Sequence, residues 1–323
     1  MRPFLFIFFA FLASACATTQ PAAPSVPTAA TDGAWPRQIE TLTGPVTLER
    51  QPQRLHALSL GFEEILLALA GPERFAAVST LAVDPSLSNV VPIASRVPRK
   101  VSRDPEAIVA SDPDAVIAST TTRQDLLDRL RAAGVTVFIA PHRETIDELP
   151  QTIRWLARIS GDEAAGERMV ATVQQRLARV DAVVATKPSA ERPRTLLVTS
   201  AGYWVAGDGA LRDVQLVRAG GRNAAAEAGI QGDKTIGLES IVAIDPAVII
   251  TADNPAGDLA RQLRELPALA DVTAIKTGRV IPITKTRVSI LSHYQVLGVE
   301  DMARALYPAD FAGVSFPDFP DRF

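Results

Sequence analysis

The sequence predicts an α/β protein made of two related lobes that a long helical segment joins. Short apolar runs alternate with amphipathic, helix-like runs in two separate regions, which is typical of parallel sheets covered by helices. Residues 143–185, with apolar residues at helical spacing, separate the two regions, and a motif of the first region returns in the second.

The first region carries the elements of an N-terminal lobe, expected at residues 35–142. Thr43-Gly44-Pro45 is a turn signal between two extended segments and predicts a hairpin over residues 38–48. Gly71-Pro72 and Gly134 follow helix-like runs and end them. The predicted strands are 54–59, 75–80, 114–119 and 135–140, and the predicted helices are 62–70, 105–111 and 124–133.

A long helical stretch follows. Its only weak point is Ser160-Gly161, so the spacing predicts either one long helix or two in close succession. A polar break comes next, and a second alternating region begins at Thr195. We therefore expect a backbone helix at 143–186, a C-terminal α/β lobe at 187–308 and a C-terminal tail at 309–323.

An internal repeat relates the two regions. Residues 105–119 (PEAIVASDPDAVIAS) align without a gap to residues 238–252 (LESIVAIDPAVIITA), and seven of the fifteen positions are identical. Residues 62–71 and 211–220 form a second, weaker echo. A repeat at this distance is not that of a solenoid. It indicates two related lobes, each with its own sheet.

The N-terminus has the anatomy of an export signal. Arg2 is the only charged residue before position 32, and residues 4–15 form an apolar run too short to span a bilayer. Small residues precede Cys16, the single cysteine of the chain, in the pattern of a bacterial lipobox. We expect a signal peptide at 1–15, lipidation of Cys16, and a flexible tether at 16–34, which is rich in Ala, Thr and Pro. The protein is thus expected to be exported and held at a membrane, in the periplasm or at the cell surface.

Composition and motifs argue against several classes of function. The net charge of -3 and the absence of any run of Lys and Arg disfavour a nucleic-acid-binding protein. No phosphate-binding loop, metalloprotease motif, nucleophile elbow or cysteine pair occurs, so neither an enzyme nor a cofactor is expected. The three histidines, His56, His142 and His293, are isolated, and we expect no metal site. His56 is predicted in the core, and only His293 is considered as an axial ligand.

Motifs spread over most of the chain together carry a family resemblance. They are Arg54-Leu55 with the following Leu58-Ser59, the two Glu-x-Ile-Val-Ala-x-Asp-Pro units, residues 219–223 (AGGRN) and residues 268–280 (ALADVTAIKTGRV). Their order and spacing resemble those of class III, helical-backbone periplasmic binding proteins, which serve ABC importers of vitamin B12, ferric siderophores or haem. The resemblance implies two Rossmann-like lobes bridged by one long α-helix.

The resemblance also implies where a permease would dock. In this family a glutamate at the start of one helix in each lobe enters arginine pockets of the permease, and the matching positions are Glu106 and Glu239. Asp104 and Pro105 suit the N-cap and first position of the helix that contains Glu106. An exposed carboxylate on each lobe pairs well with arginine. For either residue alone, stabilisation of its own helix terminus is the alternative.

Ligand contacts are expected in the loops that follow the strands, because two α/β lobes face each other there. The rings of Tyr203-Trp204, directly after a strand, suit a macrocycle or an aryl chelate. Arg96 and Arg287 are candidates for pairing with ligand carboxylates, with surface salt bridges as the alternative. The predicted ligand-binding residues are Phe62, Thr80, Arg96, Thr120, Tyr203, Trp204, Arg287 and His293.

The expected function is that of an extracytoplasmic substrate-binding lipoprotein of an ABC importer. It would capture an iron chelate (siderophore or haem) or a corrinoid between its lobes, as a monomer, and deliver it to a permease dimer with its ATPase. A non-transport envelope lipoprotein or sensor with the same fold, and an enzyme on the same scaffold, stay open as alternatives. An enzyme would require titratable cleft residues with shifted pKa values.

Overall fold

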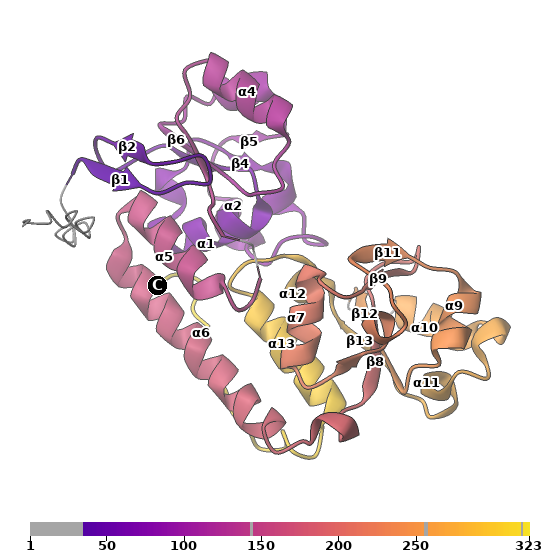
Figure 1. Cartoon of the computed structure of the whole chain (residues 1–323). Coiled ribbons are helices and arrows are strands. Elements are labelled where there is room, and N and C mark those ends of the chain that lie inside the picture. Colours follow the sequence, from indigo (N-terminus) through magenta and orange to yellow (C-terminus); the bar gives the residue numbers. More distant parts are fainter. Residues whose placement is uncertain (1–34, 143–144, 255–257, 318) are drawn as a thin grey trace, which may run out of the picture. The chain divides into compact units, whose positions relative to one another are not determined.

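The computed structural model describes residues 35–142, 145–254, 258–317 and 319–323 (Figure 1). The predicted signal peptide, Cys16 and the predicted tether lie outside the described residues. Within the described part of the chain, no helix combines the length and the apolar character needed to cross a membrane.

The N-terminal lobe is built on short strands. They are β1 (Arg37–Ile39), β2 (Val46–Leu48), β3 (Leu55–Ala57), β4 (Val78–Ser79), β5 (Lys100–Val101), β6 (Ala115–Ala118) and β7 (Val137–Ile139). The predicted hairpin is confirmed as the antiparallel pair β1 and β2. A parallel sheet has the order β3-β6-β7, and the parallel pair β4 and β5 adjoins it through a bridge between Leu55 and Phe75. The parallel α/β character of this lobe is therefore confirmed.

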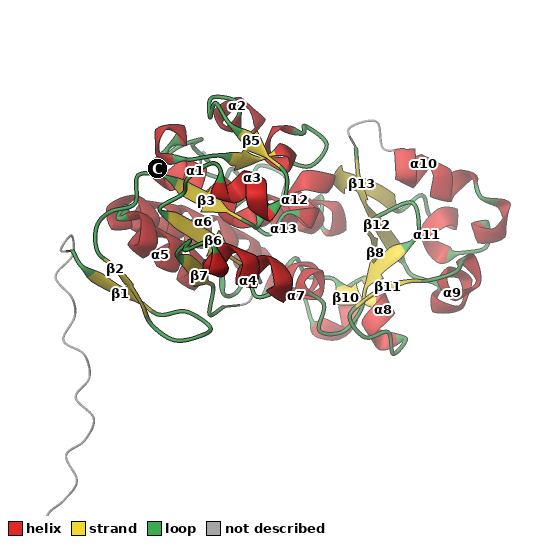
Figure 2. Cartoon of the chain, turned by 90° about the horizontal axis from the view of Figure 1, so that it is seen from above, coloured by secondary structure: helices red, strands yellow, loops and turns green. Residues whose placement is uncertain are grey.

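Helices surround this sheet (Figure 2). They are α1 (Leu60–Ala70), α2 (Val91–Ala94), α3 (Pro105–Val109), α4 (Gln124–Ala132) and α5 (Leu149–Ser160), with the 3-10 turns η1 (Pro72–Arg74) and η2 (Thr80–Val83). Every residue of α1 is buried, as expected for a helix that is almost entirely apolar. Helix α4 instead buries one face, which carries Leu126, Leu127 and Leu130.

The long helical stretch is two helices. Helix α5 ends at Ser160, Gly161 adopts the left-handed conformation with φ 77°, and α6 runs over Glu163–Val184, 22 residues. Because glycine has no Cβ, it takes this conformation without the strain that other residues meet. The two helices pack side by side, α5 also contacts α1 and β1, and α6 continues toward the C-terminal lobe (Figure 1). Of the two alternatives that the spacing left open, the structure shows the second, with α6 as the long helix.

The C-terminal lobe has a mixed six-stranded sheet. Its strands are β8 (Arg194–Val198), β9 (Trp204–Ala206), β10 (Arg222–Asn223), β11 (Asp233–Thr235), β12 (Val248–Asp253) and β13 (Val280–Thr284). The order is β11-β9-β8-β12-β13, and β10 also pairs with β8. Strands β10, β8, β12 and β13 are parallel, whereas β9 and β11 are antiparallel to their neighbours.

Short helices cover this second sheet. They are α7 (Leu211–Arg218), α8 (Ala224–Glu227), α9 (Leu238–Ile244), α10 (Asp258–Glu265), α11 (Thr273–Lys276), α12 (Lys285–Ser289) and α13 (Gln295–Leu306), with the 3-10 turns η3 (Ser189–Glu191) and η4 (Pro267–Leu269). Helix α13 packs against α6, α7 and α12. It therefore joins the second lobe to the long helix.

The internal repeat of the sequence is also a repeat of backbone conformation. Residues 105–119 form α3 and β6, and residues 238–252 form α9 and β12. Between helix and strand, Asp112 and Asp245 both have a positive φ, 54° and 43°, and each precedes a proline. Aspartate tolerates this left-handed conformation better than most residues. The matching units confirm that the two lobes are related.

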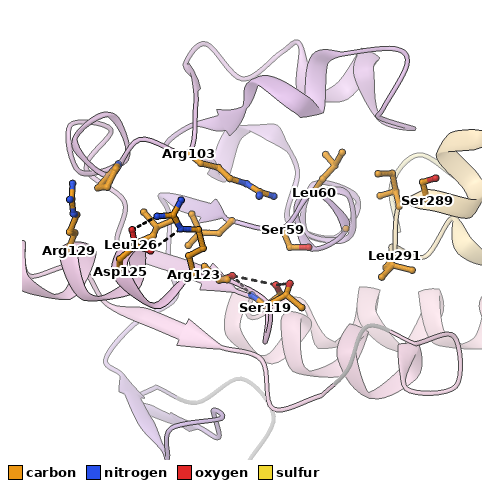
Figure 3. Close-up of a pocket in the computed structure, with 16 residues that line it drawn as sticks. Ser59, Leu60, Arg103, Ser119, Arg123, Asp125, Leu126, Arg129, Ser289 and Leu291 are labelled. Carbon is orange, nitrogen blue, oxygen red and sulfur yellow. Dashed lines mark hydrogen bonds and ion pairs between the residues drawn. The ribbon is translucent and has the colours of Figure 1, made fainter. Parts of the chain in front are cut away.

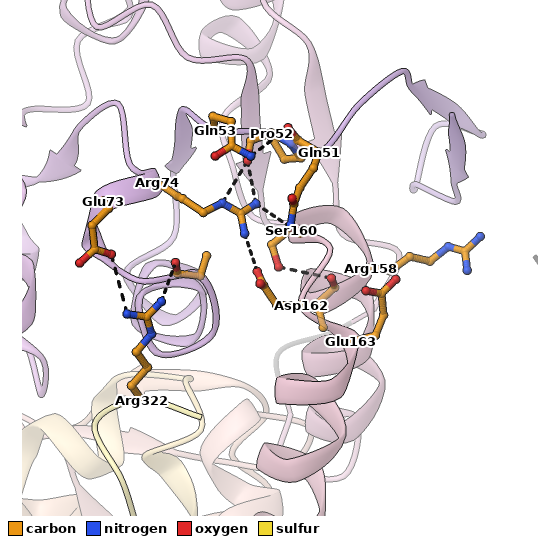
Figure 4. A network of polar contacts seen from close by, with 12 residues as sticks. Gln51, Pro52, Gln53, Glu73, Arg74, Arg158, Ser160, Asp162, Glu163 and Arg322 are labelled. Carbon is orange, nitrogen blue, oxygen red and sulfur yellow. Dashed lines mark hydrogen bonds and ion pairs between the residues drawn. The ribbon is translucent and has the colours of Figure 1, made fainter. Parts of the chain in front are cut away.

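Polar contacts fasten the N-terminal lobe to the helical pair (Figure 4). Arg74 donates hydrogen bonds to the carbonyl oxygens of Pro52 (2.7 Å) and Ser160 (2.5 Å), and pairs with Asp162 at 2.9 Å. Arg322, from the C-terminal tail, lies 3.9 Å from Glu73. These contacts hold the corner between α5 and α6 against the segments that flank β3.

A buried ion pair joins α6 to α13. Arg176 donates two parallel hydrogen bonds to Glu300, at 2.7 and 2.6 Å, and also contacts the carbonyl oxygen of Pro317 in the tail. Both side chains are less than one tenth exposed. Because burial disfavours the charged carboxylate, the pKa of Glu300 is raised although Arg176 opposes the shift. The bidentate geometry compensates in part for the desolvation of both charges.

Candidate functional site

A cavity of about 620 Å³ lies beside the first sheet (Figure 3). Residues 58–61 line it after β3, residues 119, 121–123, 125 and 126 line it after β6, and Arg103 with Pro105 contributes a third edge. Residues 289–291, at the C-terminal end of α12 and directly after it, line its remaining side. Since β3 and β6 are parallel neighbours, their carboxyl ends place these two loops side by side, where ligands bind in open α/β sheets.

The polar wall of the cavity is the loop after β6. Thr122 Oγ1 accepts a hydrogen bond from the backbone N–H of Ser119 at 3.1 Å, and the hydroxyls of Ser119 and Thr121 lie 3.0 Å apart. This loop therefore presents several hydroxyl groups in a defined arrangement. Together with Leu58, Leu60 and Leu126, they make a mixed apolar and polar lining.

The charged residues of the cavity are mainly cationic. Arg103, Arg123 and Arg129 line it, and Asp125 is its one acidic residue. Arg123 holds that carboxylate with two hydrogen bonds, 2.9 and 2.6 Å, which lower the pKa of Asp125. Arg103 has no hydrogen bond or ion pair with the described residues, and its side chain extends toward Ser59 and Leu60 (Figure 3). A net positive lining of this kind favours an anionic ligand.

A close backbone contact forms the boundary of the cavity next to α1. A Cβ atom placed on Gly61 would lie 2.7 Å from the carbonyl oxygen of Leu291, so only glycine allows this approach. Behind it, Glu64 accepts hydrogen bonds from the Ser292 hydroxyl (2.5 Å) and the Asn89 backbone N–H (2.8 Å). Thr286 donates in turn to the Asn89 side chain at 2.7 Å. The start of α1 is thus fastened to the segment after α12.

Two adjacent glutamates of α1 are buried behind the cavity. Both oxygens of Glu63 accept from Ser79, one from the backbone N–H and one from the hydroxyl, each at 2.6 Å. Burial raises the pKa of Glu63 to about 7 and that of Glu64 to about 6, although these hydrogen bonds oppose the shift. Neither residue lines the cavity. Their pKa values are therefore shifted by burial in the core that supports the site, and not by a position on the cavity surface.

Two of the predicted ligand contacts are buried in the core. Phe62 lies in the first turn of α1, as predicted, but it has no exposed surface and its ring centre is 6.2 Å from that of Trp155. His293 is also fully buried, and its ring stacks on Phe319 of the C-terminal tail at 5.1 Å. Neither ring nitrogen of His293 has a hydrogen-bond partner among the described residues, and desolvation lowers its pKa to about 3. The tail, which carried no signal in the sequence, covers this histidine.

The other N-lobe candidates and Arg287 lie outside the cavity lining. Thr80 is exposed at the start of η2, and Thr120 is exposed between lining residues 119 and 121. Arg96 pairs with Glu73 at 3.1 Å and Arg287 pairs with Asp301 at 2.9 Å, so both form the salt bridges considered as the alternative. His56 lies in the core, as predicted, with Nδ1 3.0 Å from the carbonyl oxygen of Ala77.

The aromatic pair of the C-terminal lobe occupies a tight turn between β8 and β9. Tyr203 has φ 53°, which is rare for a bulky residue, and Trp204 is 46% exposed. The turn is closed by hydrogen bonds from Tyr203 N–H to the Ser200 carbonyl (2.9 Å) and from Thr199 N–H to the Trp204 carbonyl (2.8 Å). Backbone strain of this kind is often found at ligand sites. Neither ring lines the 620 Å³ cavity.

The two predicted docking glutamates occupy equivalent places. Glu106 lies in the first turn of α3 and Glu239 in the first turn of α9, and both are exposed. Asp104 caps α3 by accepting a hydrogen bond from Ala107 N–H at 3.2 Å, as the sequence predicts. Because both side chains are exposed, both carboxylates can be reached by a partner.

Sequence reasoning missed the three arginines of the cavity. In the loop after β6 only Thr120 was predicted as a ligand contact, three residues before Arg123. Arg103 and Arg129 are far apart in the sequence from each other and from the second lobe, and no periodic pattern marks them. The alternation of predicted strands and loops was the one signal for this part of the site. The loop after the strand, taken a few residues further, includes Arg123.

Comparisons with known proteins agree with this architecture. The profile described as periplasmic binding protein matches residues 56–286, and the chain belongs to this family of substrate-binding proteins. A cobalamin-binding protein of Halobacterium salinarum is 27% identical over 249 residues, which cover 76% of this chain and 66% of that relative, slightly less than two thirds of its length. The ABC transporter substrate-binding lipoprotein YvrC of Bacillus subtilis is 23% identical over 272 residues, covering 82% and 83% of the two chains.

Solved structures show the same fold. The periplasmic heme-binding protein RhuT from Roseiflexus sp. RS-1 in apo form superposes with a TM-score of 0.68 and 27% identity, covering 80% of this chain and 99% of that one. A periplasmic heme-binding protein from Pseudomonas aeruginosa has a TM-score of 0.66 and 28% identity, covering 80% and 94%. The two-lobed class III architecture predicted from the sequence is thereby confirmed.

Proposed function

We propose that this protein captures an anionic metal chelate or tetrapyrrole, most directly haem, in the cavity and delivers it to an ABC importer. The observation that carries the proposal is the cavity itself: about 620 Å³, lined by three arginines and several hydroxyls. This volume lies in the range of roughly 300–1,000 Å³ that small-molecule sites occupy. Arginine pairs with carboxylates through two parallel hydrogen bonds.

The charge of the lining favours haem or a carboxylate-bearing siderophore over a corrinoid. Haem presents two carboxylates, whereas a corrinoid presents mainly amide groups. Names of the relatives support both chemistries, since two of the similar structures are heme-binding proteins and one curated relative is a cobalamin-binding protein. Arg103, without an ion-pair partner among the described residues, is the first candidate for a ligand carboxylate.

Trp204 and Tyr203 stay proposed as ligand contacts from the second lobe. An exposed tryptophan beside a strained tyrosine is an unusual feature of a surface turn, and both rings suit the face of a planar macrocycle. This part of the proposal requires the turn between β8 and β9 to meet a ligand that is held in the arginine-lined cavity.

Delivery completes the proposed function. Glu106 and Glu239 would dock onto cationic pockets of a permease dimer with its ATPase, one from each lobe. Lipidation of Cys16 and the tether at 16–34 would keep the protein, as a monomer, at the membrane outside the cytoplasm. The curated relative YvrC is named as a substrate-binding lipoprotein, which supports this location. The proposal contains no catalytic step.

Ligand titration tests the proposal. The purified mature domain is titrated with haemin, cobinamide, cobalamin and several ferric siderophores, by the Soret band for haemin and by tryptophan quenching for the others. We expect saturable binding of haemin, weakened roughly ten-fold by Arg103→Ala, because a charged hydrogen bond is lost. Arg154→Ala is the matched control, since Arg154 forms an exposed ion pair away from the cavity. Equal affinities of the two variants, or cobalamin binding tighter than haemin binding, would contradict the assignment.

A further inference from the structure

Two cavities meet at the junction of α3 and α4. The first is the arginine-lined cavity described above. The second, of about 570 Å³, lies against the first turn of α3 and is lined by Glu106, Val109, Ala110, Ala132 and Ala133. Pro105 and Arg129 line both cavities. These two residues therefore form the partition between the proposed ligand site and the proposed docking carboxylate.

On the side that faces α3, Arg129 is weakly paired with Glu106. Its Nη1 lies 4.0 Å from Glu106 Oε1, and the two side chains are 64% and 74% exposed. At this distance the contact is an ion pair without a hydrogen bond, and exposed pairs of this kind are weak. The guanidinium thus faces the carboxylate of Glu106 in the first turn of α3.

The ligand side offers Arg129 no competing carboxylate from the protein. The one acidic residue of the cavity, Asp125, is held by Arg123 through two short hydrogen bonds. Arg129 lies at the end of the cavity opposite Ser289 and Leu291 (Figure 3). An anionic ligand in the cavity would be a new partner for Arg129, and the long side chain turns between two partners at little cost.

We propose that Arg129 couples occupancy of the ligand cavity to the charge that Glu106 presents to the permease. This inference rests on the proposed function. In the empty protein Arg129 partly neutralises Glu106, and an anionic ligand draws the guanidinium away and leaves the carboxylate free for a cationic partner. Because coupling between two sites is reciprocal, a cation bound to Glu106 also favours ligand binding.

The coupling belongs to one lobe only. Glu239 occupies the equivalent place in α9, but no ion pair joins it to any described residue. The repeat therefore provides two docking carboxylates, of which the one in the N-terminal lobe responds to the ligand. A permease that contacts both would distinguish a loaded from an empty binding protein at the Glu106 contact.

Affinity measurements with haemin test the coupling without a permease. Glu106→Gln should tighten haemin binding about 1.5- to 5-fold, because Arg129 no longer shares its charge with a protein carboxylate. Arg129→Gln should weaken binding, and in that background Glu106→Gln should have no further effect. Glu167→Gln is the matched control, since Glu167 pairs with Arg154 away from both cavities. A Glu106→Gln effect that persists without Arg129, or that Glu167→Gln reproduces, would overturn the inference.

A ligand-free measurement separates this inference from the assignment of haem. The side-chain carboxyl ¹³C resonance of Glu106 is compared between the wild type and Arg129→Gln, with the resonance of Glu167 as reference. We expect the Glu106 signal to shift and the Glu167 signal to stay in place. An unchanged Glu106 signal refutes the ion pair on which the coupling depends, whereas failure of haemin to bind the wild type refutes the ligand class alone.

Discussion

Replacing Glu63 by glutamine should change how the stability of the protein depends on pH. Both oxygens of Glu63 bind Ser79 at 2.6 Å in the core, and burial raises the pKa of its carboxyl from 4.5 to about 7. A carboxyl whose pKa is raised by folding favours the folded state in its protonated form. Its contribution is complete below pH 4.5, the ordinary value, and is lost as the pH rises through about 7.

The size of the effect follows from the shift. Each pKa unit corresponds to about 1.36 kcal/mol, so ionisation of Glu63 costs on the order of 3 kcal/mol of folding free energy by pH 8. Glutamine keeps an acceptor for the Ser79 backbone N–H and a donor for its hydroxyl, and it has no charge to bury. Glu63→Gln should therefore match the wild type near pH 5 and exceed its stability by on the order of 2 kcal/mol at pH 8.

Thermal unfolding of both proteins at pH 5 and pH 8 measures this difference. For a chain of this size the gain corresponds to a rise in Tm of roughly 3 °C at pH 8. His293 titrates in both proteins, so its contribution cancels in the comparison. Glu64 adjoins Glu63 and its charge helps to raise the pKa of Glu63, so the measured difference includes the repulsion between the two carboxylates. A difference in Tm that is the same at both pH values would refute the raised pKa of Glu63.

Three further substitutions test the packing around the site, each by its effect on the free energy of unfolding. Gly61→Ala places a Cβ atom 2.7 Å from the carbonyl oxygen of Leu291 and should destabilise by about 1–3 kcal/mol, with altered haemin affinity. His293→Phe removes two buried nitrogens that lack partners among the described residues while keeping a ring against the tail, so it should stabilise by about 1–2 kcal/mol and leave haemin binding unchanged. Arg176→Met leaves Glu300 buried without its partner and should cost about 3–5 kcal/mol.

Matched variants serve as controls for two of these changes. Gly202→Ala adds the same methyl group where the nearest atoms are 3.9 Å away, so it should change stability little. Arg154→Met breaks an exposed pair with Glu167 and should cost less than about 1 kcal/mol. If Gly61→Ala lowers the free energy of unfolding no more than Gly202→Ala does, the backbone at Leu291 moves to make room for the methyl group at little cost. Stabilisation by His293→Phe together with lost haemin binding would reinstate His293 as a ligand contact.

Much of the fold could be predicted from local sequence patterns. The hairpin at Gly44, the parallel strands of the first lobe and the duplicated unit that contains Asp112 and Asp245 all depend on turn residues and periodicity within short segments. The residues of the candidate site could be predicted only in part. Thr120 and its neighbours follow a recognisable strand, but Arg103 and Arg129 have no local signal, and their common cavity arises from the packing of α3 against α4.

The amino-acid sequence alone determined the α/β class, the relation between the two lobes and the acidic residue at the start of α3 and α9, because each depends on residues close together in the chain. Tertiary structure alone decided three other properties. It buried His293 under the tail, closed Gly61 against Leu291, and placed Arg129 between two cavities. Each of these requires segments distant in sequence to meet, and the chain's local chemistry does not specify which side chains face one another across such a contact.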